Sequence, residues 1–190
     1  MAKPSSGAIP DSRTVNGIRI TNERNPDAAL TRAMNEARAQ ALRDFPELAG
    51  QDVMFNTLTQ GDFSKQSVLG VHNSTNRRIT ISNDVVANRD ATNGWTQNGS
   101  LQHVAAHELG HSLSRVAPVG FVSSERAFDK AFRQFKKSNP RASEKQFARS
   151  ISNYAAESKR EAFAEAFADF NRNGRNATLA SRLIMEKWRA

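Results

Sequence analysis

The stretch LQHVAAHELGHSLS, residues 101–114, decides how this chain is interpreted. Its main apolar residues recur at the spacing of one helix face: Leu101, Ala105, Leu109 and Leu113. Val104 adds apolar character on a second side, and a helix that is apolar on two sides is a buried helix. We therefore predict a buried helix that Ser100 caps and that ends near Arg115.

Two histidines of this predicted helix, His107 and His111, are four residues apart. That spacing places both imidazoles on one face, close enough to share a metal ion. Glu108 follows the first histidine, so its carboxylate can reach a metal-bound water without binding the metal. Zinc lowers the pKa of such a water to about 7, which lets a neighbouring carboxylate take its proton. The pattern predicts one catalytic Zn2+ ion, and the alternative is a core helix with two hydrogen-bonded histidines.

Two histidines leave a zinc site short of one protein ligand. Cysteine is absent, and only four histidines occur in the chain. His103 lies on the correct face, but it is about 12 Å from His111 along the helix axis. We therefore expect His103 to start the helix or to support a ligand from behind, rather than to bind the metal.

A second segment, about fifty residues later, offers carboxylates at helical spacing: Glu157, Glu161 and Glu165. One interpretation is the solvated acidic face of a surface helix. The alanines that flank these glutamates favour a second interpretation, because small side chains let two helices approach closely. In that case the acidic face would pack against the metal helix and supply the missing ligand.

The HELGH sequence, followed by YAAESKREAFAEAF at residues 154–167, resembles the zincin metallopeptidases whose third ligand is a glutamate. In particular it is similar to the catalytic domain of anthrax lethal factor and to related toxin- or phage-associated peptidase domains. The resemblance covers residues 100–113 and 151–170. Family members often carry Asn where this chain has Glu157 or Ser158, and this departure leaves Glu157 without an assigned role.

The resemblance implies a site in which His107, His111 and Glu161 hold the zinc ion. Tyr154 stands seven residues before Glu161, the family spacing, and would lie near the metal. Glu165 would orient a histidine from behind, as partners of metal ligands commonly do.

The function implied is that of a zinc-dependent metalloendopeptidase acting on a peptide or protein substrate, in a toxin, effector or phage setting. Glu108 would act as the base, and Tyr154 would donate a hydrogen bond to the oxyanion. The strand expected at Arg78–Ser82 would pair with the substrate backbone. The alternative is a catalytically silent zinc-binding structural or virion-assembly protein.

The order of the expected elements predicts an α+β domain over residues 25–190, after a polar N-terminal extension over residues 1–24. The resemblance implies that this domain has a zincin-like fold. Asn25-Pro26-Asp27 starts a helix that Pro46 ends, with Asn25 as the expected cap. Short strands are expected near residues 17–21, 53–58, 67–72 and 78–82, and a loop at 88–99. Helices should follow around Phe128–Phe135, after the Ser143–Gln146 capping box, and over residues 157–171 and 176–189.

Composition narrows the class of protein. The formal net charge is +8, yet the Lys and Arg residues are scattered along the sequence without a nucleic-acid motif, so we do not expect nucleic-acid binding. No run approaches the roughly 20 apolar residues of a membrane span. The first ten residues lack the apolar core of a signal peptide, so we expect a cytoplasmic protein, or export without such a signal. No feature indicates an oligomeric state.

Overall fold

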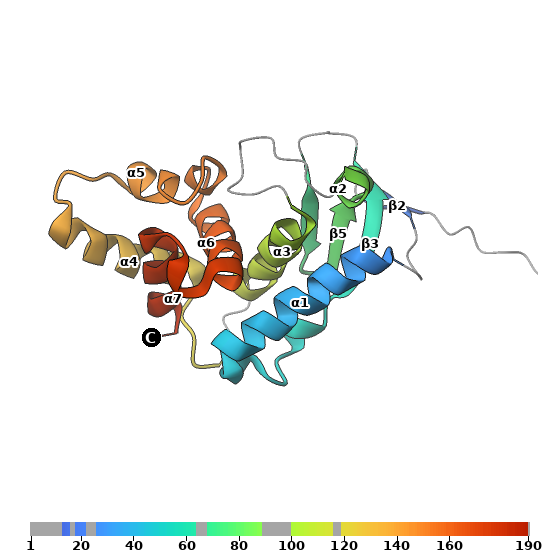
Figure 1. The fold of residues 1–190 in the computed structure, drawn as a ribbon, viewed down its shortest axis with the longest axis horizontal. Coiled ribbons are helices and arrows are strands. Elements are labelled where there is room, and N and C mark those ends of the chain that lie inside the picture. The colour runs from blue at the N-terminus through green and yellow to red at the C-terminus, as the bar shows by residue number, and fades with distance from the viewer. Residues whose placement is uncertain are drawn as a thin grey trace, which may run out of the picture.

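The computed structural model describes residues 13–15, 18–21, 26–63, 68–88, 100–115 and 119–189. Within these residues a five-stranded sheet combines with helices, which confirms the α+β class. The sheet lies at one end of the molecule, helices α4 to α7 lie at the other, and α3 lies between them (Figure 1). Asn25 and most of the loop expected at 88–99 fall outside the described residues.

The strands are β1 (Arg13–Val15), β2 (Ile18–Thr21), β3 (Thr57–Asp62), β4 (Gly70–Asn73) and β5 (Arg78–Ser82). Their order in the sheet is β1-β2-β3-β5-β4, with β3 and β5 parallel and the other neighbours antiparallel. The expectation that Arg78–Ser82 pairs with a substrate is therefore wrong, because both of its edges are already paired. The outer strand on this side of the described sheet is β4.

Several details of the sheet and its surroundings differ from the sequence prediction. The region of residues 1–24 supplies two strands, β1 and β2, where one was expected. The strand predicted at 53–58 instead begins at Thr57, because Asp52–Phe55 forms a 3-10 turn, η2. A short helix, α2 (Asn83–Asn88), follows β5 directly and was not predicted.

The first long helix, α1 (Ala28–Asp44), is capped by Asp27, whose side chain accepts hydrogen bonds from the backbone of Ala29 and Leu30. The prediction of Asn25 as the cap is therefore corrected by two residues. Pro46 opens the 3-10 turn η1 (Pro46–Leu48), as expected for a residue that ends a helix. The buried face of α1 packs against α3.

The other helical elements are α3 (Leu101–Arg115), α4 (Ser124–Ser138), α5 (Glu144–Arg149), η3 (Tyr154–Ala156), α6 (Lys159–Asn173), η4 (Gly174–Asn176) and α7 (Leu179–Trp188). The Ser100 side chain accepts from the His103 backbone, and the Ser143–Gln146 capping box is present, so both predicted caps are confirmed. Trp188 is fully buried and packs edge-on against Phe45 and Phe163. These contacts anchor α6 and α7 to the rest of the core.

Helices α3 and α6 approach each other closely at Gly110. A Cβ atom at this position would lie 3.0 Å from the Cα of Ala164 and 3.2 Å from the Cβ of Phe167. Such distances are shorter than ordinary van der Waals contact, so the two helices meet closely only because this residue is glycine. The small residues at this contact let the helix faces that carry the predicted metal ligands come together.

We expect Gly110→Val to lower the free energy of unfolding by about 1–3 kcal/mol, because the added methyl groups overpack this contact. Chemical denaturation monitored by circular dichroism measures the change. Gln102→Val is the control, since Gln102 is exposed on the same helix and takes the same β-branched side chain without a packed neighbour to displace. Equal destabilisation by the two substitutions would contradict the close contact.

Candidate metal centre

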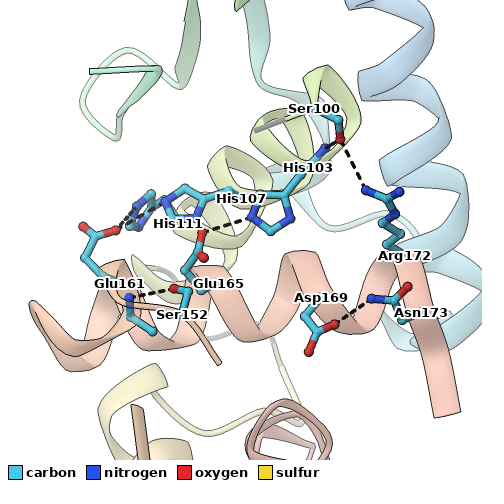
Figure 2. Close-up of polar contacts among 11 residues, drawn as sticks. Ser100, His103, His107, His111, Ser152, Glu161, Glu165, Asp169, Arg172 and Asn173 are labelled. Carbon is cyan, nitrogen blue, oxygen red and sulfur yellow. Dashed lines mark hydrogen bonds and ion pairs between the residues drawn. The ribbon is translucent and has the colours of Figure 1, made fainter. Parts of the chain in front are cut away.

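Three side-chain atoms from α3 and α6 converge on one point (Figure 2). Glu161 Oε2 lies 3.3 Å from His107 Nε2 and 3.1 Å from His111 Nε2. The two histidines share a face of α3, and Ser158 caps α6 so that Glu161 falls in its first turn. The structure thus brings together the three residues predicted as metal ligands.

These three side chains form a group that could hold a metal ion, since their ligand atoms lie within 4.8 Å of one another. Glu161 Oε2 is buried, yet it accepts no well-aligned hydrogen bond from any described residue. The three atoms are nevertheless close enough to share one cation. Two imidazole nitrogens and one carboxylate oxygen suit zinc, and the same set also occurs around Fe(II).

Glu165 lies directly behind this cluster and is fully buried. Its Oε1 atom is 2.8 Å from His107 Nδ1 and 3.1 Å from His103 Nε2, so it accepts a hydrogen bond from each ring. Because Glu165 holds a proton on Nδ1 of His107, Nε2 is the nitrogen that would bind a metal once it has lost its own proton. The direct hydrogen-bond distances favour this supporting role over a second metal site.

Of the two roles expected for His103, the structure favours support of a ligand from behind. It contributes no atom to the His107–His111–Glu161 cluster, and its Nε2–H holds the carboxylate that orients His107. The contact joins residues 62 positions apart, so no local pattern could have revealed it.

The ionisation of the cluster follows from opposing effects. Burial would raise the pKa of Glu161, but its contacts with His107 and His111 outweigh burial and lower the pKa to about 2. Burial would likewise lower the pKa of His107, but Glu161 and Glu165 outweigh it and raise the pKa to about 10. Without a metal the cluster is thus held together by charge, and a bound cation would replace the proton on His107 Nε2.

Glu108 lies on the side of α3 that faces the sheet and is only 4% exposed. Burial raises the pKa of its carboxyl group, which brings it closer to the range useful for a general base. Its Oε2 atom is buried and has no hydrogen-bond partner among the described residues.

Gly70 of β4 makes room for this carboxylate, and sequence reasoning missed it. A Cβ atom at Gly70 would lie 2.6 Å from Glu108 Oε1, which no structure tolerates without a shift. A glycine inside a predicted strand is a known sign of such a close approach and could have indicated it.

Tyr154 opens η3 and its ring stacks on His107, with centroids 5.6 Å apart and an angle of 26° between the planes. Burial and the nearby carboxylates of Glu161 and Glu108 raise the pKa of its hydroxyl, so the group stays protonated and can donate a hydrogen bond. Glu157 is exposed and belongs to neither candidate metal group.

The fourth histidine, His72 of β4, lines a separate cavity of about 340 Å³ beside Ser112. Burial, together with the charges of Arg115 and His111, lowers the pKa of His72 to about 4, so its ring is neutral. It is not part of the donor cluster.

Comparisons of the chain with protein-family models, curated proteins and solved structures found no match. Among the described residues, no helix has both the length and the hydrophobicity needed to cross a bilayer.

Proposed function

We propose that this chain is a zinc-dependent metallopeptidase with a zincin-like fold, which hydrolyses peptide bonds of a protein substrate. The observation that carries the proposal is the convergence of His107, His111 and Glu161 beside Glu108, whose buried Oε2 has no hydrogen-bond partner among the described residues. The resemblance of residues 100–113 and 151–170 to zincins supports the same conclusion.

The proposed chemistry assigns each side chain one task. Zinc, when bound, supplies a Lewis acid that polarises the scissile carbonyl and lowers the pKa of water. Glu108 removes the proton of the attacking water and later delivers it to the leaving amine. Glu165 keeps His107 in the tautomer that a metal ligand requires.

Two further features would hold the substrate. The Tyr154 hydroxyl donates a hydrogen bond to the oxygen on which negative charge develops. The outer strand β4 passes Glu108 at Gly70 and, in the described sheet, is paired only with β5. An extended substrate could therefore add to β4 as a further strand, with its scissile bond next to Glu108.

The number of donors and the buried carboxylate of Glu108 favour a catalytic metal site over a purely structural one. Structural zinc is enclosed by four protein ligands, whereas catalytic zinc keeps an open position. The described residues supply three converging donors, and Glu108 belongs to neither candidate metal group. The silent structural or virion-assembly protein therefore ranks second.

The test is incubation of the zinc-loaded protein with a diverse peptide library, read by mass spectrometry, with metal content measured by plasma mass spectrometry. We expect cleavage that a chelator abolishes and that added zinc restores, while far-UV circular dichroism shows little change. Unfolding on chelation without any cleavage would instead support the structural role. Restoration by Fe(II) alone would exclude zinc as the metal.

A further inference from the structure

Strand β4 runs alongside α3, and the cavity that His72 lines lies between the two elements. A Cβ atom at Gly70 would lie against Glu108, and His72, two residues further along β4, lines the cavity of about 340 Å³ together with Ser112. Gly70 and His72 lie on one side of the strand, because side chains alternate along it. Glu108 and Ser112 are four residues apart and lie on one face of the helix. The cavity therefore lies about one helical turn, roughly 5–6 Å, beyond the carboxylate that we propose as the base.

The wall of this cavity is polar throughout. Each lining residue is a glycine or carries a polar or charged side chain. Asn56 and Ser112 are buried, whereas Asp52, Ser74 and Arg77 are exposed. An apolar side chain placed here would take these polar groups out of water without giving them hydrogen bonds. The wall therefore favours a ligand that forms hydrogen bonds.

The charge around the cavity is positive. Arg77 Nη1 lies 3.0 Å from Asp52 Oδ2, so these two charges offset each other. Arg115, in the last turn of α3, forms no ion pair with a carboxylate among the residues that the structure describes, and its Nη1 donates to Ser74 Oγ over 2.8 Å. Because the Ser74 oxygen accepts this hydrogen bond, its own O–H can donate another. The charge of Arg115 acts at the cavity wall, since after burial it is the next largest cause that lowers the pKa of His72.

The backbone of Arg77 adds a sign that this cavity has a function. Its φ angle is 49°, a left-handed conformation that favours glycine. Residues held in such strained conformations cluster at binding sites. The side chain that this strained residue supplies pairs with Asp52, which is the only carboxylate that lines the cavity. The pair thereby reduces the repulsion that an anion would meet there.

We propose that this cavity is a specificity pocket, which binds an aspartate or glutamate side chain of the substrate close to the scissile bond. The proposal rests on the peptidase function given above and names its substrate class. One helical turn beyond Glu108 corresponds to about two residues of an extended peptide, at roughly 3.3 Å per residue. The bound carboxylate accepts hydrogen bonds from Ser74 and from the guanidinium of Arg115, and such charge-assisted hydrogen bonds are among the strong ones.

A basic side chain of the substrate fits the pocket less well. It would meet the charge of Arg115, and it would find the carboxylate of Asp52 already paired with Arg77. A neutral amide would form hydrogen bonds but would gain nothing from the charge of Arg115. Comparison of glutamate with glutamine therefore isolates the contribution of this charge.

The test measures binding instead of cleavage, so it does not depend on turnover. Glu108→Gln protein, purified with zinc, is titrated into fluorescein-labelled octapeptides of alanine that carry one glutamate at each successive position, and into a matched series with glutamine. Fluorescence anisotropy gives each Kd. We expect one position at which glutamate binds about fivefold more tightly or better, and we expect Arg115→Gln in the same background to bring that ratio to about one. Arg182→Gln is the matched control, because it removes the same charge from an exposed residue of α7, at the end of the molecule opposite the sheet (Figure 1).

Three outcomes would overturn the pocket: equal binding of glutamate and glutamine peptides at every position, an unchanged ratio in Arg115→Gln, or an equal loss in Arg182→Gln. Each of them can occur while the parent protein still cleaves peptides. Selective binding that Arg115→Gln abolishes, in a protein whose parent form cleaves no peptide, would support the pocket and contradict the proposed cleavage. Retention of the parent melting temperature shows that each variant is folded.

Discussion

Glu108→Gln is expected to lower kcat for peptide cleavage by about a hundredfold or more, while zinc remains bound. The amide keeps the size of the side chain but cannot accept the proton of the attacking water. Since Glu108 belongs to neither candidate metal group, the metal content should stay at one zinc per chain. Single-turnover kinetics with a cleaved peptide and plasma mass spectrometry measure the two quantities.

Glu157→Gln is the matched control for this variant. It removes the same charge from an exposed residue of the segment between Tyr154 and Glu161, and it should leave both kcat and zinc content unchanged. Cleavage by Glu108→Gln at the parent rate would show that another group acts as the base, even if the zinc site itself is correct.

The second large effect is expected from Glu161→Ala, which removes the only carboxylate of the donor cluster. Zinc affinity should fall by more than the roughly 10–100-fold that loss of an orienting partner causes. Glu165→Gln is the reference variant, with the smaller expected fall in zinc affinity. It alters the group behind His107 and leaves all three donors present. Competition with a coloured zinc chelator measures the zinc affinity of the parent protein and of both variants.

The order of these affinities distinguishes the two glutamates. If Glu165→Gln weakened zinc binding more than Glu161→Ala, the metal would lie in the His103–His107–Glu165 group instead. Both variants should lose cleavage, so the affinity rather than the activity decides between them.

The helices could be predicted because their signals are local. The apolar spacing and the Ser100 cap predict a helix that matches Leu101–Arg115, and the capping box predicts the start of α5. The strand order could not be predicted in this way. Parallel pairing of Thr57 with Arg78 joins residues far apart in sequence, and this pairing makes β5 an interior strand.

In the candidate site, too, the local features could be predicted from the sequence and the long-range contacts could not. His107 and His111 are separated by three residues, and this spacing alone predicts that both lie on one face of the helix. Only the resemblance to zincins identifies Glu161 as the third ligand, because spacing alone allows any of three glutamates. The contacts of His103 with Glu165 and of Gly70 with Glu108 depend on how α6 and β4 pack on α3, which no short stretch of sequence specifies.

The close approach of α3 and α6 at Gly110 has a thermodynamic consequence for the whole molecule. The three donors come from two helices that meet only in the folded chain, so the metal would bind the folded state and not the unfolded one. By mass action, free zinc at a hundred times its Kd would add about 2.7 kcal/mol to the free energy of unfolding. The melting temperature of this protein would then report the zinc concentration of its surroundings.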